Sequence, residues 1–431
     1  MKDNVVSVKL WGKEVCKLQW MGGYKKGFGK LGAKVSFHPE YHLQGWDLDP
    51  LGPYTTNHYS VRLGLSDWCR ATEYEGLPRF ISSSLPDEWG NTVFGAWADN
   101  NLLKHSQITA VDKLAFIGSR GMGALEFVPS LYTAQSPESI ALEELREVAL
   151  SVQRAKEEMR LNLNENPGIN ELMAVGMSAG GMHPKAIIAI NKSTGEVRSG
   201  QVPLPENFTH FILKFNEASV WPSAELEYIY YLLALKAGIH MEESSLLGIH
   251  GENHFLTERF DRKKGGKLHS ATLQSLNGKT ESYEGIFNVC RQLSVPYIDQ
   301  EQLFRRAVFD YFCGVCDNHD KNYSFIMYPN GNWRLAPAYD ITFSVNLGNR
   351  FIGDRHYMTI AGLERDIEKK HLLELAETND IRNASSIISE VYDAASAFES
   401  IATEQNIPEP IIHVIADYIK TVAPKLLAVS R

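Results

Sequence analysis

The segment CGVCDNHDKNYSFIMYPNGNWRLAPAYD, residues 313–340, places charged and amide side chains between two apolar runs. The preceding run, QLFRRAVFDYFCGVC (302–316), repeats its apolar residues at helical spacing, which predicts a helix with one buried face. After the charged residues, YSFIMY (323–328) and NWRLAPAY (332–339) flank a Pro-Asn-Gly turn. This pattern is typical of a β-hairpin. We therefore expect the charged residues to lie at the open end of a hairpin.

We expect this hairpin to bring three polar residues together. Because a hairpin brings its open ends together, Asn322 should lie beside Asp340. Asp317 and Asn322 are separated by four residues, the spacing of the D-x-x-x-x-N pattern in kinase catalytic loops. Phosphoryl transfer needs a carboxylate that orients the acceptor hydroxyl and oxygen ligands for Mg²⁺. We predict the first role for Asp317 and the second for Asn322 and Asp340, with His319 and Lys321 holding the loop or touching phosphate. On this segment alone, a polar turn rich in Asp and Asn is the alternative.

A kinase also needs a glycine loop, a strand lysine and a helix glutamate upstream. GMSAGGMHPK (176–185) precedes the apolar run AIIAIN, and HFILKF (210–215) carries Lys214 inside an apolar strand. A buried lysine needs a negative charge nearby, which a phosphate or Glu227 of the following helix would supply. The alternative is a lysine that extends from an edge strand into solvent. HFLTERFDR (254–262) is interpreted as a connector between lobes that contacts adenine through its backbone.

Two other glycine-rich segments receive different interpretations. GFGKLG (27–32) fits the dinucleotide-binding pattern, but it precedes a strand-like segment and not a helix, so we reject that function. GSRGMG (118–123) is predicted to be a strand-to-strand turn.

The remaining chain alternates between strands and helices, which indicates an α+β protein. The predicted elements are strands at 5–11, 14–20, 34–38 and 58–65, a helix within 80–105 that starts at Pro86 and Asp87, an amphipathic helix at 139–163, and helices near 367–377, 384–404 and 410–428. The predicted parts are a β-rich N-terminal subdomain (1–135), a nucleotide-binding part (136–262), and a catalytic and helical C-terminal lobe (263–431).

Composition excludes some classes of function. The net charge of −9 argues against a broad basic face, so direct nucleic-acid binding is not expected, although local basic patches remain compatible with it. Five cysteines indicate a reducing compartment, and Cys313 and Cys316 are interpreted as core thiols. We expect a cytoplasmic protein without a signal peptide or membrane span, because the most apolar helical run, 229–239, is too short. Six tryptophans between Trp11 and Trp97 are expected mainly to pack a core.

With these motifs in order, nearly the whole chain resembles the HipA family of bacterial serine/threonine kinases, the toxins of toxin–antitoxin pairs. The segments that carry the resemblance are SLPDEWGNTVF (84–94), FIGSRGMGALEFVP (116–129), SAGGMHPK, HFILKF, ERFDR, CDNHDKN and PAYD. The resemblance implies a two-lobed, protein-kinase-like fold with a β-rich N-terminal subdomain and an all-helical C-terminal lobe.

The resemblance also implies ATP and Mg²⁺ as cofactors and assigns roles by position. Asp317 would be catalytic, and Asn322 and Asp340 would bind the metal. Ser178 would be autophosphorylated, which in the family drives the glycine loop out and switches the kinase off. The residues that would line the ATP site are Gly180, Gly181, Met182, His183, Pro184, Lys185, Lys214, Glu258, Arg259, Phe260, His319, Asp320, Lys321, Asn322, Tyr339 and Asp340.

The implied partners are a small HipB-like helix-turn-helix antitoxin and a protein substrate of the translation machinery, such as an aminoacyl-tRNA synthetase. DNA would be contacted only through the antitoxin. The chain departs from the family at HSATLQSLNG (269–278), where an acidic and aromatic motif is common, and at His183 and Pro184, which replace more polar residues of some members. Two alternatives stay open, namely a catalytically idle pseudokinase that acts as a co-repressor or scaffold, and a small-molecule kinase.

Overall fold

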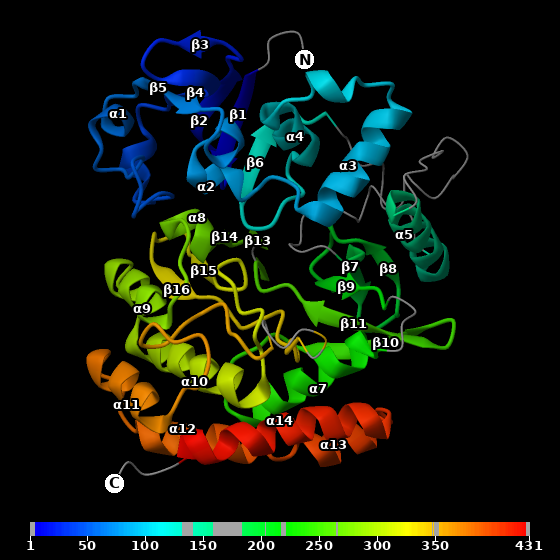
Figure 1. Ribbon diagram of the computed structural model, residues 1–431. Helices are drawn as coiled ribbons and strands as arrows, with labels where there is room; N and C mark the ends of the chain where they lie inside the picture. The colour runs from blue at the N-terminus through cyan, green and yellow to red at the C-terminus, as the bar shows by residue number, and fades with distance from the viewer. Residues whose placement is uncertain are drawn as a thin grey trace. The chain divides into compact units, whose positions relative to one another are not determined.

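The computed structural model describes residues 5–131, 141–157, 183–202, 204–216, 221–263, 266–346, 348 and 353–427 (Figure 1). The chain forms two compact units. The first comprises Met1–Glu217, Gly248–Ala271 and Ile326–Asn332, and the second comprises Ala218–Leu247, Thr272–Phe325 and Trp333–Arg431.

Six strands of the first unit form one antiparallel sheet: β1 (Val5–Leu10), β2 (Lys13–Trp20), β3 (Tyr24–Lys25), β4 (Gly29–Phe37), β5 (Ser66–Arg70) and β6 (Leu125–Val128). The order is β3-β4-β2-β1-β6, and β5 pairs with β4. In β1 the buried residues alternate with partly exposed ones, which is the pattern of a sheet with one face on a core. The predicted strands at 5–11, 14–20 and 34–38 are confirmed.

The first unit also contains the helices α1 (Tyr59–Arg62), α2 (Arg79–Ser82), α3 (Glu88–Asn100), α4 (Ala110–Ile117) and α5 (Leu142–Glu157), with 3₁₀ turns η1 (Tyr41–Gln44), η2 (Tyr74–Gly76) and η3 (His105–Gln107). The predicted start signal of α3 is confirmed, because the Asp87 carboxylate accepts a hydrogen bond of 2.6 Å from the backbone N–H of Gly90. Helix α5 confirms the described part of the helix predicted at 139–163.

The strand predicted at 58–65 is wrong, because these residues begin with helix α1. The Nδ1 atom of His58 accepts a hydrogen bond of 3.3 Å from the backbone N–H of Ser60 and so caps the helix. Only Val61 of the apolar residues is fully buried here, whereas Leu63 is 67% exposed. A short alternating run thus fitted one helical turn as well as a strand.

The strand-to-strand turn predicted at 118–123 is also wrong. The residues before it belong to α4, so the segment connects a helix to β6. Thr109 and Asp112 form a capping box at the start of α4, with the Thr109 side chain accepting from Asp112 N–H and the Asp112 carboxylate accepting from Thr109 N–H. This sequence signal identifies the helix, while the apolar run alone did not.

A second sheet has the order β10-β11-β9-β7-β8. Its strands are β7 (Lys185–Asn191), β8 (Val197–Ser199), β9 (Phe208–Lys214), β10 (Ser244–Ile249) and β11 (Glu252–Glu258). The register pairs Lys214 with Lys185 on one side and with Phe255 on the other. The predicted strands around AIIAIN, HFILKF and the start of the connector are therefore confirmed.

The hairpin predicted from the Pro-Asn-Gly turn is present. It belongs to a three-stranded sheet of order β14-β15-β16, formed by β14 (His269–Thr272), β15 (Ser324–Met327) and β16 (Trp333–Leu335), and a two-stranded ribbon of β12 (Arg262–Lys263) and β13 (Gly266–Lys267) precedes it. The turn closes with hydrogen bonds from Tyr328 N–H to Asn332 O and from Gly331 N–H to Tyr328 O. Gly331 has a φ of +83°, which glycine adopts without strain.

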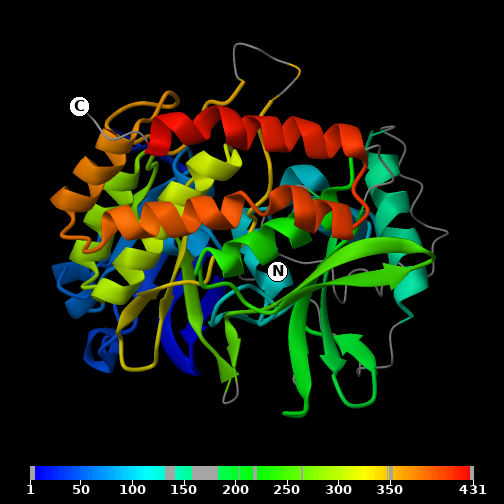
Figure 2. The same cartoon turned by 90° about the horizontal axis from the view of Figure 1, so that it is seen from below.

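The second unit is mainly helical. Its helices are α7 (Ser223–Lys236), α8 (Leu273–Asn277), α9 (Tyr283–Gln292), α10 (Tyr297–Cys313), α11 (Lys369–Thr378), α12 (Ala384–Ala395), α13 (Phe398–Glu404) and α14 (Glu409–Leu427). Helices α12, α13 and α14 lie together in two views at right angles (Figures 1 and 2). The single helix predicted at 384–404 is wrong, because a turn at Ser396 and Ala397 separates α12 from α13. No Gly or Pro at this turn indicates it in the sequence.

The structure confirms that Cys313 and Cys316 are core thiols. It also confirms that some of the six N-terminal tryptophans pack in a core. All five cysteines are buried and unpaired, including Cys313 and Cys316. Trp46, Trp89 and Trp97 are at most 9% exposed, while the other three tryptophans of the N-terminal region are only partly buried. Among the helices of the described residues, none combines the length and apolar character needed to cross a membrane.

Gly314 ends α10 with a φ of +66°, and a β-carbon there would lie within 3.0 Å of Val345, Phe343 and Tyr418 side-chain atoms. We expect Gly314→Ala to lower the free energy of unfolding by about 2–4 kcal/mol, because backbone strain and overpacking add. The matched control is Gly362→Ala, where φ is +74° but no atom lies within 4 Å, so only the smaller strain remains. Urea unfolding measures both, and equal losses would contradict the packing argument.

Candidate active site

The loop after α10 presents Asp317 and is fixed from behind by Ser344. The Ser344 Oγ atom accepts hydrogen bonds of 2.8 Å from the Cys316 N–H and 2.9 Å from the Asp317 N–H. The Ser344 N–H in turn donates to the Gly314 carbonyl oxygen. The backbone of Asp317 is therefore held while its side chain stays exposed.

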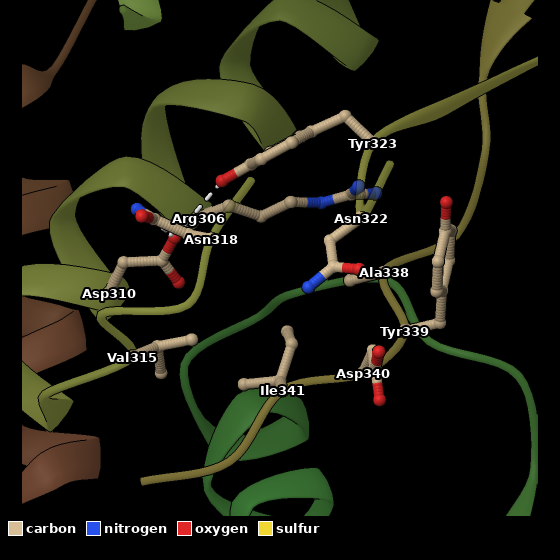
Figure 3. Close-up of a pocket in the computed structure, with 10 residues that line it drawn as sticks. All are labelled: Arg306, Asp310, Val315, Asn318, Asn322, Tyr323, Ala338, Tyr339, Asp340 and Ile341. Carbon is tan, nitrogen blue, oxygen red and sulfur yellow. Dashed lines mark hydrogen bonds between the residues drawn. The ribbon is translucent and has the colours of Figure 1, made fainter. Parts of the chain in front are cut away.

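The hairpin brings Asn322 to the end of the returning strand, as predicted. The Tyr339 hydroxyl donates a hydrogen bond of 2.7 Å to the Lys321 carbonyl oxygen and shares another of 2.7 Å with the Ser324 hydroxyl. These contacts hold the two ends of the hairpin together. Asn322 and Asp340 consequently line the same hollow in the second unit (Figure 3).

Asn322 also joins the two halves of the loop. Its Nδ2 atom donates a hydrogen bond of 2.9 Å to the Asp317 carbonyl oxygen. This bond fixes the amide orientation, and within the described part of the chain the Oδ1 atom accepts no hydrogen bond. An amide oxygen held in this way is available as a ligand for a hard cation.

The hollow is partly open and is lined by both polar and apolar atoms; the space free of protein atoms is about 290 Å³ when the open solvent at its mouth is included. In Figure 3 the Arg306 side chain extends towards Asn322, and the Tyr323 hydroxyl is directed to Asp310. The lining residues are Arg306, Asp310, Val315, Asn318, Asn322, Tyr323, Ala338, Tyr339, Asp340 and Ile341.

The charge of Asp340 acts on the carboxylate of Asp317. The pKa of Asp317 is raised, chiefly because the protein around this exposed side chain displaces part of its water; His319 opposes this shift and the negative charge of Asp340 adds to it. Asp340 has a left-handed backbone with φ of +57°, a strained conformation that Asp tolerates better than most residues. The Asp340 carboxylate and the fixed amide oxygen of Asn322, which line the same hollow, are donors of the kind that suits Mg²⁺, because this ion typically takes one or two protein carboxylates and keeps several waters.

A buried carboxylate on α10 supports this loop. The Asp310 Oδ2 atom accepts hydrogen bonds from the Tyr283 hydroxyl, from the Tyr323 hydroxyl at 3.0 Å and from Asn318 Nδ2 at 3.1 Å. Asn318 follows Asp317, and Tyr323 follows Asn322. One carboxylate thus holds both ends of the segment that carries the candidate catalytic residues.

Arg306 lies one helical turn before Asp310 and anchors the returning strand. Its guanidinium donates a hydrogen bond of 2.5 Å to the Ala336 carbonyl oxygen, four residues before Asp340. Both residues are buried, at 4% exposure for Arg306 and 3% for Asp310. Helix α10 therefore fixes the loop and the strand from a single face.

Burial raises the pKa of Asp310 to about 6, and hydrogen bonds from Tyr283, Asn318 and Tyr323 oppose the shift. Because the folded pKa exceeds the unfolded value, the folded chain binds this proton more tightly, and the resulting stabilisation is lost as pH rises through about 6. Between about pH 5 and pH 7.5 we expect the wild type to lose about 1–2 kcal/mol of unfolding free energy relative to Asp310→Asn. Urea unfolding at both pH values tests this, and a parallel change in the two proteins would contradict it.

The other predicted residues of the second unit lie in the loop itself or on helix α7. Asp320 is 2% exposed, and its carboxylate accepts hydrogen bonds of 3.3 Å from Gln274 Nε2 and Thr280 N–H, so its side chain holds the loop in place. The His319 ring lies edge-on to Tyr357, with 6.0 Å between ring centroids. Lys321 is exposed, and Glu227 on α7 is half-buried.

The remaining predicted ATP-site residues belong to the first unit. Lys214 ends β9 with its ammonium 5.8 Å from the Phe255 ring centroid, and Lys185, 4% exposed, lies 3.9 Å from an Asp87 carboxylate oxygen. Pro184 is buried beside it, and its carbonyl oxygen accepts from the Phe215 N–H; His183 is exposed. Ser178, Gly180, Gly181 and Met182 lie outside the described residues.

The connector residues Glu258, Arg259 and Phe260 differ in burial and in the contacts of their side chains. Glu258 lies 3.8 Å from the Lys192 ammonium, and Phe260 is 8% exposed. The Arg259 guanidinium is fully buried and binds both oxygens of Asp261, at 2.9 and 2.8 Å. The side chain of Arg259 is therefore committed to a structural ion pair, and its backbone N–H donates a hydrogen bond of 2.9 Å to the His210 carbonyl oxygen.

Sequence reasoning missed the support of the loop. Ser344 and Tyr283 lie far from the D-x-x-x-x-N pattern in the chain, Arg306 and Asp310 lie in the helix that precedes it, and none of the four belongs to a recognisable motif. The one available signal was spacing, because Arg306 and Asp310 are four apart and interrupt the apolar face of a predicted helix.

Two known domains match this chain. The HipA-like C-terminal domain matches residues 177–398, more than half of the chain, and the HipA N-terminal domain matches residues 33–128. The chain belongs to the HipA family. The match to the C-terminal domain contains Asp317, Asn322 and Asp340, so the candidate site lies within the part of the chain that the family shares.

A solved structure of the toxin–antitoxin system of Shewanella oneidensis MR-1, which contains HipA, HipB and operator DNA, has the same fold. Its similarity to this HipA-family chain gives a TM-score of 0.65 over 98% of this chain and 96% of that chain, at 16% identity. This similarity confirms the predicted α+β HipA-type fold, with a β-rich N-terminal part and a helical C-terminal region.

A protein of Haemophilus influenzae described as "Putative kinase" is 29% identical to this chain over 185 residues. The match covers 38% of this chain and 52% of that protein. The chain thus spans about half the length of this curated relative.

Proposed function

We propose that this HipA-family chain is an ATP- and Mg²⁺-dependent serine/threonine protein kinase. The observation that carries the proposal is that Asn322 and Asp340 line one hollow at the open end of the hairpin, with Asn322 hydrogen-bonded to the Asp317 carbonyl oxygen and the charge of Asp340 acting on the Asp317 carboxylate. This set supplies one carboxylate for a hydroxyl proton and two oxygen ligands for a metal, as phosphoryl transfer requires.

In this proposal each residue has a definite task. The Asp317 carboxylate, on a backbone fixed by Ser344, orients the acceptor hydroxyl and takes its proton at Oδ. The Asn322 Oδ1 atom and the Asp340 carboxylate hold Mg²⁺, which neutralises negative charge on the phosphates when bound. Positioning and charge neutralisation provide most of the acceleration.

The first unit supplies the phosphate clamp. The ammonium of Lys214 and the glycine loop around Gly180 and Gly181 hold the phosphates, and the connector from Glu258 to Phe260 contacts adenine through its backbone. Lys214 is the last residue of the apolar strand β9 and is half-buried, and an anionic partner would offset the partial loss of water around this cation, which supports the assignment.

The finer parts of the proposal concern substrate, regulation and partner. The chain phosphorylates a protein of the translation machinery, such as an aminoacyl-tRNA synthetase, and autophosphorylates Ser178 in its own glycine loop. Its partner is a HipB-like helix-turn-helix antitoxin, through which it reaches DNA indirectly. The Shewanella structure, which holds HipA, HipB and operator DNA together, supports the partner.

Incubation of the full-length chain with ATP and Mg²⁺, followed by mass spectrometry, tests the proposal. We expect one phosphate on Ser178, no phosphate when Mg²⁺ is chelated, and none on the Ser178→Ala variant. Ser193→Ala is the matched control, because Ser193 lies in an ordinary turn with its hydroxyl on Asn191 Oδ1. ATP binding without any transfer to Ser178 or to a lysate protein would indicate a pseudokinase, and transfer only to metabolites would indicate a small-molecule kinase.

A further inference from the structure

The N-terminal sheet concentrates positive charge in a chain that is acidic overall. Residues 5–38 contain seven lysines and one acidic residue, whereas the whole chain carries a net charge of −9. These residues form β1 to β4, at one end of the first unit in Figure 1. Opposite charges attract over about a Debye length, so such a local excess attracts polyanions despite the overall charge.

The strand register places cations on the open face of this sheet. Lys17 pairs with Ser36, and Lys34 pairs with Trp68. Paired residues of antiparallel strands share a face, and the neighbouring residue Val35 points to the opposite, buried face. Lys17 is exposed, and Lys34 and Trp68 are partly exposed, so their face is open to solvent.

Aromatic rings lie among these cations. The Lys25 ammonium is 4.2 Å from the Trp68 ring centroid, and the Arg70 guanidinium is 5.1 Å from that of Phe28. Tyr24, beside Lys25 on β3, is 78% exposed. We define the basic-aromatic face as Lys17, Lys25, Lys34, Arg70, Phe28 and Trp68.

Nearby acidic groups do not cancel this charge. Glu14 lies 3.7 Å from Lys17, and Glu73 lies 3.3 Å from Arg70. Both cations are about half exposed, and ion pairs at such positions contribute little free energy. The cations can therefore exchange these partners for phosphates at little cost.

We propose that the basic-aromatic face binds single-stranded nucleic acid. Lysines spaced along a sheet neutralise a phosphate backbone, and aromatic rings between them stack on unpaired bases. An acidic peptide would use the cations but would gain little from the rings. A duplex would hide its bases from a flat sheet. The flexible side chain of Lys25 moves from the Trp68 ring to a phosphate, which leaves the ring to a base.

Fluorescence anisotropy with the full-length chain and labelled oligo(U) or oligo(dT) of about 20 nucleotides tests this proposal. We expect binding that weakens with salt, and about tenfold weaker binding with a log–log salt slope shallower by about 1.4 for the double variant Lys25→Ala/Lys34→Ala. Lys236→Ala/Lys370→Ala, with two exposed lysines of the second unit, is the matched control and should bind as the wild type does.

The substitution Trp68→Leu measures the contribution of the aromatic ring to binding, apart from that of the lysines. We expect roughly 5- to 100-fold weaker binding with an unchanged salt slope. Trp68→Phe should restore most of the affinity, and thermal melting excludes unfolding as the cause. The proposal is overturned if neither oligonucleotide binds at low salt, or if the Lys25/Lys34 variant binds like the control. It is also overturned if a polyglutamate peptide or a duplex competes better than the single strand.

Discussion

Replacing Asp317 with asparagine is expected to lower the rate of phosphate transfer by about 10²–10⁴-fold, because the acceptor hydroxyl loses the carboxylate that takes its proton. The side chain keeps its size, and the Ser344 hydroxyl still binds the backbone at this position. The fold and the affinity for ATP should therefore remain. Steady-state kinetics with a fixed protein substrate should show the loss in kcat and little change in KM for ATP.

Asp320→Asn is the matched control for this experiment, because it changes a neighbouring carboxylate of the same loop. Asp320 is buried and holds Gln274 and Thr280, so its replacement should lower stability more than it lowers the rate per folded molecule. An Asp317→Asn protein that transfers phosphate at the wild-type rate would remove Asp317 from the chemistry.

The second large effect is expected for Asp340→Asn. Asparagine tolerates the left-handed backbone at this position as aspartate does, so the substitution tests charge and not strain. Outer-shell partners of metal ligands contribute roughly 10- to 100-fold in affinity, and loss of a charged ligand should raise the Mg²⁺ concentration for half-maximal rate by at least as much. The rate at saturating ATP, titrated with Mg²⁺, measures this shift.

The same variant should also change the ionisation of Asp317. The negative charge of Asp340 raises the pKa of Asp317, so its removal should lower that pKa and move the acid limb of the residual pH–rate profile to lower pH. Asp366→Asn is the control, because Asp366 is an exposed carboxylate of the second unit that pairs with Lys425. It should leave both profiles unchanged, and an Asp340→Asn profile that matches it would show that Asp340 does not face Asp317.

The sequence alone predicted the arrangement at the centre of the site. A Pro-Asn-Gly turn between two apolar strands fixes where the chain reverses, and reversal at Gly331 brings Asn322 to Asp340 without knowledge of any distant contact. The strand that ends at Lys214 followed from a local apolar run in the same way. Local rules sufficed wherever the decisive contacts were between residues close in the chain.

The predictions that were wrong, and the supporting residues that were missed, depend on contacts between residues that are distant in the chain. Ser344 reaches back to Asp317 across 27 residues, and Tyr283 reaches Asp310 across the same distance in the chain. No spacing rule connects such pairs. The strand predicted wrongly at 58–65 has a related cause. Whether a short alternating apolar segment becomes a strand or a helical turn depends on the residues that it packs against.

The family match establishes the fold, but it does not establish the chemistry of the site. Helix α10 illustrates the difference, because its apolar positions were predicted from periodicity, while the use of Arg306 and Asp310 as inward anchors was visible only in the folded chain. Buried polar residues of this kind determine where the loop stands, and so they determine whether the candidate ligands converge.

A crystal structure of the full-length chain with Mg²⁺ and a non-hydrolysable ATP analogue tests the central claim most directly. We predict one metal ion with the Asn322 Oδ1 atom and an Asp340 carboxylate oxygen at about 2.1 Å, and the Asp317 carboxylate facing the terminal phosphate. A metal bound elsewhere, or Asp340 turned away from Asn322 with the nucleotide in place, would contradict the account.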